Sequence, residues 1–291
     1  MTTAVLPNAP TGYSESVWTA LLRNPSALIG ATMLALVLTL ALLAGTLYPG
    51  DPLDMVAMPM LWPGDDPGYF LGSDSLGRDV AAGIAHGARG SLLIAASATL
   101  ISVLIGGLVG ALAGYHGGKL GDVLMRLCEV FQTVPSFLLV IVIVAIGNPT
   151  LGVIALAIGI SSWPTVARLV RAEFRTLREA DFVTAARSLG FGNSAIILRE
   201  ILPNALPPLI VTTSVMVATA ILIESALAFL GLGDPNRVSW GSLIGAGREM
   251  LRTAWYLTAF PGAMIVATVL SLNLVGDTLN DALNPRLRGL S

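Results

Sequence analysis

The sequence predicts an all-α membrane protein with six transmembrane helices and a cytoplasmic helical segment between the fourth and the fifth. Hydrophobic residues make up 54% of the chain and charged residues 12%, against about 25% charged residues in an ordinary soluble domain. Long intervals carry no charge, and several of them reach the roughly 20 residues that a spanning helix needs. Basic residues gather in one stretch, residues 168–199, which indicates a segment on one side of the membrane.

The first apolar run lies at residues 27–48 and follows a segment, residues 1–26, with one basic residue, Arg23. The run is longer than the roughly 7–15 apolar residues of a signal peptide, so we expect a retained transmembrane helix. Residues 49–90 come next and are rich in Pro, Gly and Asp. This composition favours turns, and we expect an ordered, irregular extracytoplasmic loop there instead of a domain.

Residues 91–276 are predicted to form a core of the other five helices, followed by a cytoplasmic tail at residues 277–291. The motif "GNPT" at 147–150 is typical of a tight turn and divides one long charge-free interval into two spans. The expected spans of the core are 91–115, 131–147, 150–167, 205–230 and 254–276. In the first of these, Gly106, Gly110 and Gly114 repeat at four-residue spacing. Such spacing allows close approach of another helix, from this chain or from another subunit.

The distribution of basic residues predicts that both termini are cytoplasmic. With this orientation eleven basic residues lie inside and five lie outside. The inner residues are Arg23, Lys119, Arg126, Arg168, Arg171, Arg175, Arg178, Arg187, Arg199, Arg286 and Arg288, and the outer ones are Arg78, Arg89, Arg237, Arg248 and Arg252.

The main cytoplasmic segment, residues 168–204, begins with arginines that extend the fourth helix and are explained by a solvated helix end. A short helix is expected at about 181–189, ended by Gly190 in the left-handed conformation. A helix of this length is not stable alone in water and has to pack on a surface. That surface is a groove of another protein or, alternatively, its own bundle or the lipid headgroups. The motif "LPNALPP" at 202–208 is expected to interrupt the regular helix before the fifth span.

The pattern "AA…G…LP" in this segment resembles the cytoplasmic "EAA" signature of permease subunits of ABC importers. Thr184 stands where that signature has glutamate, so a salt bridge from this position is not carried over. The resemblance implies that the short helix is a coupling helix, which fits a groove on an ATPase subunit and transmits ATP-driven movement. The residues to which the resemblance and the local pattern give this role are Phe182, Thr184, Ala185, Ala186, Leu189, Gly190, Leu202 and Pro203.

Further motifs resemble the C-type permeases of the oligopeptide, dipeptide and nickel ABC importers over about residues 15–290. They include "LGSDSLGRD", "GARGSL", "GYHGGKLGDVLMRLCEVFQTVP", "ESALAFLGLG", "SWGSLIGAG" and "GDTLNDALNPRL". The resemblance implies the type I ABC importer permease fold in the cytoplasmic membrane. It also implies a second, homologous permease, two ATPase subunits (or one fused) that bind ATP and magnesium, and an extracytoplasmic peptide-binding protein. No catalytic residue, metal site or cofactor is expected in this chain.

Two groups of charged residues outside the cytoplasmic segment have an open role. Glu224 is an acidic residue within the apolar part of a span, and such a residue lines the substrate path or makes a structural hydrogen bond. Asp74, Arg78 and Asp79 form a compact cluster in the outer loop. They either cap local turns and pair with one another, or contact a substrate-delivering receptor or the second permease.

Other classes of protein fit the sequence less well. The chain contains no G-x-x-x-x-G-K-[ST] phosphate loop, no H-E-x-x-H motif and no G-x-S-x-G with histidine and acid in register, which argues against an ATPase and an intramembrane enzyme. A single cysteine, Cys128, and two distant histidines, His86 and His116, do not suggest a metal centre. A net charge of −2 gives no sign of nucleic-acid binding. A secondary transporter or channel, and an importer of nickel chelates or glutathione-like peptides, remain as alternatives.

Overall fold

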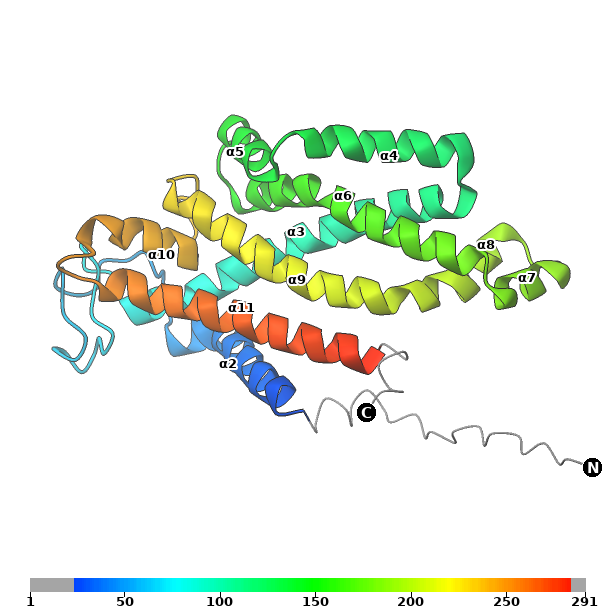
Figure 1. Ribbon diagram of the computed structural model, residues 1–291. Helices are drawn as coiled ribbons and strands as arrows, with labels where there is room; N and C mark the ends of the chain where they lie inside the picture. Colours follow the sequence, from blue (N-terminus) through cyan, green and yellow to red (C-terminus); the bar gives the residue numbers. More distant parts are fainter. Residues whose placement is uncertain (1–23, 284–291) are drawn as a thin grey trace, which may run out of the picture.

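The computed structural model describes residues 24–283, and it is a bundle of long helices (Figure 1). Its helices in chain order are α2 (Pro25–Leu47), α3 (Val80–His116), α4 (Gly118–Thr133), α5 (Ser136–Gly147), α6 (Leu151–Arg178), α7 (Asp181–Ser188), α8 (Asn193–Ala195), the π-helix η1 (Ile196–Ile201), α9 (Leu202–Phe229), α10 (Trp240–Gly247), the 3-10 helix η2 (Arg248–Met250) and α11 (Tyr256–Leu283). Within the described residues the β-structure is limited to an isolated bridge between Ser73 and Asp79. The all-α fold class is therefore confirmed.

Five of the described helices are long and apolar enough to cross a membrane, and the count is six if the bent pair α4 and α5 forms one span. The third span, expected as one helix at 131–147, is instead divided between these two helices, which meet at 79°. Pro135 explains the break, since proline drives the preceding residue out of the helical region. Val134 is accordingly extended, with φ −90° and ψ 129°.

The loop before α3 ends at Asp79 and not at residue 90, where its end was expected. Asp79 caps α3 by accepting a hydrogen bond of 2.8 Å from the Ala81 N–H. Residues 80–90 are the first turns of α3, and their small side chains let α3 pack against the segment around α10. A Cβ on Gly87 would lie 3.1 Å from the Trp240 side chain. At the other end of the core, α11 continues to Leu283, beyond the expected limit at residue 276.

The three glycines spaced along α3 form the close contact between α3 and α6, the most extensive helix pair in the described chain. A Cβ on Gly106 would lie 2.5 Å from the Trp163 carbonyl oxygen, and one on Gly110 would lie 2.5 Å from the Ala167 carbonyl oxygen. A Cβ on Gly114 would meet the backbone of α6 one turn further on. The close approach predicted from their spacing is confirmed, and the partner is a helix of this chain.

The interruption expected at residues 202–208 is absent, because one helical segment runs from Asn193 to Phe229. Just before the first proline the chain takes π-helical turns, in which the Leu202 N–H donates to the Ile197 carbonyl. Pro203 follows these π-helical turns directly, at the point where η1 continues into α9. Local π adjustments of this kind are how membrane helices accommodate proline.

Candidate functional site

The predicted coupling segment and the predicted outer segments lie at opposite ends of the bundle (Figure 1). Helices α7 and α8 project at one end, and the loop before α3 lies with α10 at the other. This separation matches the placement of the two sets of residues on opposite sides of a membrane. Which end faces the cytoplasm stays a prediction.

Helix α7 begins at Asp181 and its geometry at the other end is a Schellman motif. The Phe191 N–H donates to the Ala186 carbonyl at 3.1 Å, and the Gly190 N–H donates to the Arg187 carbonyl at 3.0 Å. Gly190 has φ +82°, which is the left-handed region that glycine adopts without strain. The expected helix and its glycine stop are both confirmed.

One face of α7 is buried against its own chain. Val183 and Ala186 are 0% and 6% exposed and belong to a hydrophobic cluster with Phe174 of α6, Ile196 of η1 and Ile201. We call this the inner cluster. Because Ala186 lies in this cluster, it holds α7 to the bundle. It is therefore not accessible to a partner, and the surface left for docking contains fewer residues than the sequence predicted.

A neighbouring face of α7 exposes apolar side chains. Phe182 is 40% exposed, Leu189 is 77% exposed, and Ala185 is exposed between them. Thr184 is exposed too, and its hydroxyl approaches the Ala180 carbonyl at 3.4 Å, which is a local contact of the kind threonine makes within helices. Phe182, Ala185 and Leu189 are named the α7 exposed face. Large apolar side chains gathered on a solvent-accessible helix are typical of an interaction surface.

Polar contacts connect the C-terminal ends of α3 and α6 to the segment after α7. The Tyr115 hydroxyl at the end of α3 donates to the Asn193 side-chain oxygen at 2.8 Å. Arg178 at the end of α6 donates through Nη1 to the Tyr115 carbonyl, also at 2.8 Å. Leu202 packs against the inner cluster, while Pro203 is exposed at the start of α9. Helix α7 therefore packs where the C-terminal ends of α3 and α6 meet the segment that leads into α9.

Glu224 lies inside the junction of α3, α9 and α10, with 1% of its surface exposed. The Ser91 hydroxyl of α3 donates to its Oε2 at 3.3 Å. The same Ser91 oxygen accepts the backbone N–H of Trp240 at 3.1 Å, and the Trp240 indole donates to the Ile84 carbonyl at 3.0 Å. These contacts favour the structural reading of Glu224, although its role in transport stays a prediction.

Two of the three charged residues in the loop before α3 cap local structure. Asp74 Oδ1 accepts the N–H groups of Leu76 and Arg78, both at 2.8 Å, and Asp79 caps α3. Burial raises the pKa of the Asp79 carboxyl above its ordinary value, although hydrogen bonds from backbone N–H groups oppose that shift. Turn capping therefore accounts for both aspartates, and contact with a receptor stays a prediction.

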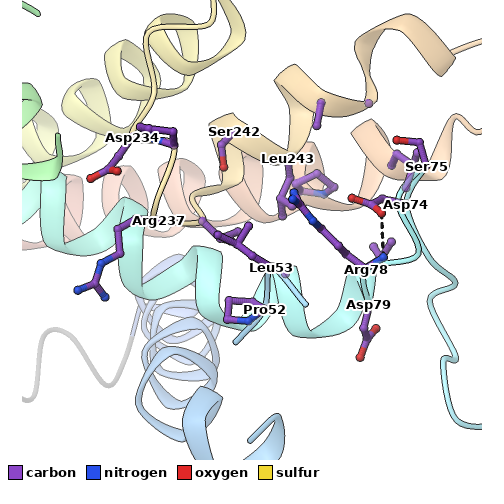
Figure 2. A pocket seen from close by; sticks show the side chains of 18 residues that line it. Pro52, Leu53, Asp74, Ser75, Arg78, Asp79, Asp234, Arg237, Ser242 and Leu243 are labelled. Carbon is purple, nitrogen blue, oxygen red and sulfur yellow. Dashed lines mark hydrogen bonds between the residues drawn. The ribbon is translucent and has the colours of Figure 1, made fainter. Parts of the chain in front are cut away.

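Arg78 extends from this loop across a pocket of about 160 Å³ toward Leu243 of α10, and the side chain of Asp79 points in a different direction from that of Arg78 (Figure 2). The Nε atom of Arg78 is buried and has no hydrogen-bond partner among residues 24–283. Mutual pairing of Arg78 with the two aspartates is not found among the side chains that the structure describes; the dashed line in Figure 2 joins Asp74 to the Arg78 backbone N–H.

Sequence reasoning did not identify the polar residues that join distant elements at the outer end. Asp234 accepts the Leu151 N–H at 2.9 Å and so fixes the start of α6 to the segment after α9. Ser91 and Trp240 link α3 to α10, although they are 149 positions apart. The acidic residue in "GLGDPN" was a visible signal for capping, but its distant partner Leu151 could not be read from the sequence.

Comparison with known proteins gives consistent matches over nearly the whole chain. Residues 106–289 match the family of binding-protein-dependent transport system inner membrane components, and residues 12–67 match the N-terminal TM domain of oligopeptide transport permease C. The di/tripeptide transport system permease protein DppC of Pseudomonas aeruginosa (strain UCBPP-PA14) is 39% identical over 280 residues, which are 94% of this chain and 92% of the relative. The glutathione transport system permease protein GsiD of Pectobacterium atrosepticum is 35% identical over 272 residues, 93% of this chain and 90% of the relative.

Among solved structures, an inward-facing conformation of the MetNI methionine ABC transporter is similar with a TM-score of 0.58. The match covers 69% of this chain and 96% of that chain at 18% sequence identity. At this identity the similarity concerns the fold alone, which is that of a type I ABC importer permease.

Proposed function

This chain belongs to the family of binding-protein-dependent transport system inner membrane components, and from that premise we propose that it is the permease subunit of an ATP-driven importer that moves peptides across the cytoplasmic membrane. The observation that carries the proposal is helix α7, which is anchored by Val183 and Ala186 and exposes apolar side chains on a neighbouring face. The relatives named as di/tripeptide and dipeptide permeases support peptides as the substrate.

The proposal includes four kinds of partner. A second, homologous permease completes the membrane part, and two ATPase subunits, separate or fused, bind ATP and magnesium at the α7 end. An extracytoplasmic peptide-binding protein docks at the opposite end, where Asp74, Arg78 and Asp79 lie. The family's description as binding-protein-dependent supports this last partner.

The orientation we propose has both termini and α7 on the cytoplasmic side, as the excess of arginine in residues 168–199 supports. It is tested by thiol labelling of intact cells in a Cys128→Ala background. A cysteine at exposed Ser188 should react only after the membrane is made permeable, whereas one at Leu76 in the loop should react from outside. The reverse pattern would refute the orientation.

In the proposed mechanism, closure of the ATPases on ATP moves α7. The α7 exposed face is held by the ATPase groove, and the buried face moves the inner cluster with it. Since that cluster contains Phe174 of α6 and Ile201 before α9, the displacement reaches two membrane helices. The pathway between the two permeases then changes the side to which it is open.

Two alternatives are distinguished by specific observations. The relative named as a glutathione permease keeps glutathione-like peptides within the substrate class, and nickel chelates remain a further candidate. A channel or secondary transporter that works without an ATPase has no use for a docking helix, and the α7 exposed face argues against it.

The proposal is tested by changing Leu189 to Ser in the full complex, with Leu120→Ser as a matched control. Leu120 is 48% exposed and lies at the start of α4, beside the end of α3. We expect Leu189→Ser to lower recovery of the ATPase subunits with the permease and to lower ATP-driven peptide uptake, while Leu120→Ser leaves both unchanged. Equal recovery and equal uptake in the two variants would contradict the docking role of α7.

A further inference from the structure

A cavity of about 270 Å³ with a mostly apolar surface lies among α3, α5, α6 and α9, within the spanning part of the bundle. Hydroxyl side chains line it from all four helices, and none of its lining residues is charged. They include Thr99 and Ser102 of α3, Ser136 of α5, Ser162 of α6, and Thr212 and Thr219 of α9. We refer to it as the hydroxyl cavity.

Hydroxyl groups at this depth need hydrogen-bond partners, because lipid tails offer none. Several of these hydroxyl groups donate to a backbone carbonyl of their own helix or of a helix packed against it. Ser102 donates to the Gly159 carbonyl at 2.9 Å, Thr212 donates to the Pro208 carbonyl at 2.9 Å, and Thr219 donates to the Val215 carbonyl at 2.9 Å. A hydroxyl that donates in this way keeps lone pairs that can accept a hydrogen bond.

Thr99 differs from these residues. It is 4% exposed, it lines the hydroxyl cavity, and its Oγ1 has no hydrogen-bond partner among the residues that the structure describes. A buried hydroxyl without a partner costs free energy, which native proteins avoid unless a water or a ligand supplies the missing bond. Thr99 therefore indicates that a hydrogen-bonding species enters the cavity.

We propose that the hydroxyl cavity is this chain's share of the transit site for substrate, and that it takes the main chain of a peptide. This inference rests on the proposed function. Each peptide unit has one N–H donor and one carbonyl acceptor, and a hydroxyl can serve either. A lining without charge neither attracts nor repels charged side chains, so it accepts peptides of different sequence.

The volume of the cavity and the absence of charged residues from its lining fit a transit site. Complete ligand sites occupy roughly 300–1,000 Å³, so a cavity of about 270 Å³ corresponds to part of a site that a second permease completes. Passage also requires that each site release what it binds, which neutral hydroxyl groups allow better than ion pairs do. Glu224 lies outside this lining and is not needed for the contact.

The test uses the assembled complex in proteoliposomes, with trialanine as the probe. Thr99→Val keeps the shape of the side chain and removes the hydroxyl, and Thr99→Ser keeps the hydroxyl. We expect Thr99→Val to lower trialanine uptake per ATP hydrolysed by about 2- to 10-fold, the effect of one lost hydrogen bond, and Thr99→Ser to restore it. Thr268→Val is the matched control, since Thr268 is buried in α11 and bonds to its own helix.

A second measurement reports occupancy directly. A cysteine at half-buried Ser162, in the Cys128→Ala background, should react with a membrane-impermeant thiol reagent during turnover, and saturating trialanine should slow the reaction. Equal uptake by Thr99→Val and the unchanged protein, or labelling at Ser162 that trialanine does not slow, would overturn the inference. So would loss of the second permease from the Thr99→Val complex, because that result assigns the hydroxyls to assembly. If the unchanged complex shows no ATP-driven uptake at all, the proposed function itself fails.

Discussion

The sharpest single perturbation of α7 is Gly190→Val, because the structure separates its conformational effect from any steric one. Gly190 has φ +82°, and a Cβ there would find nothing within 4 Å. The cost of a side chain is therefore backbone strain, about 1–2 kcal/mol for a residue in the left-handed region. A β-branched residue lies at the upper end of this cost.

This strain acts on the Schellman motif that ends α7, since Gly190 supplies one of its two hydrogen bonds. A penalty of about 1–2 kcal/mol lowers the ratio of closed to open helix end by roughly 5- to 30-fold. Leu189 precedes the glycine directly, so the α7 exposed face loses its fixed position. Gly190→Asn is the matched control, because asparagine tolerates the left-handed conformation.

The assay is uptake of peptide by the reconstituted complex, measured together with its ATPase activity. We expect Gly190→Val to lower uptake per ATP hydrolysed or to lower recovery of the ATPase subunits, and Gly190→Asn to stay close to the unchanged protein. Uptake and stimulated ATPase activity that are normal in Gly190→Val would refute the reasoning.

Two further predictions concern the packing of the bundle. Gly110→Leu should abolish recovery of folded permease in size-exclusion chromatography, because even a Cβ would lie 2.5 Å from the Ala167 carbonyl oxygen. Gly107→Leu is the control and should be tolerated, since a Cβ there meets nothing within 4 Å. Equal elution profiles for the two variants would contradict the close contact of α3 and α6. Glu224→Ala should lower the stability of the permease in thermal unfolding by about 1–3 kcal/mol, because the Ser91 hydroxyl loses the acceptor for its proton, and Glu224→Gln should lower it by less. A Glu224→Gln variant that unfolds normally yet does not transport would return Glu224 to the substrate path.

The helical architecture could be predicted because its signals are local. Charge-free intervals indicate the membrane spans. The spacing of small residues and glycine predicts a short helix, α7, that is ended by Gly190. The break at Val134–Pro135 also had a local signal, since proline excludes helix from the residue before it. The start of α3 had no such signal, because the charge-free interval begins only after Arg89. Packing against α10 decides the structure of residues 80–90.

The sites could be predicted less well than the fold, because they depend on contacts between distant residues. Ser91 and Glu224 are 133 positions apart, and nothing in either neighbourhood indicates that they meet. Serine and threonine are distributed over several spans, and the packing of four helices brings them to one cavity. The division of α7 into a buried face with Ala186 and an exposed face with Ala185 likewise requires the positions of η1 and α6.

Direct contact between α7 and an ATPase subunit is the central claim, and site-specific photo-crosslinking from Leu189 tests it most directly. Leu189 is 77% exposed and Leu120 is 48% exposed, so both can carry a photoreactive residue without disturbing the core. We predict that the complex irradiated with the probe at Leu189 yields an adduct with an ATPase subunit, and that the probe at Leu120 does not. An assembled, transporting complex in which Leu189 never crosslinks to the ATPase would contradict the account.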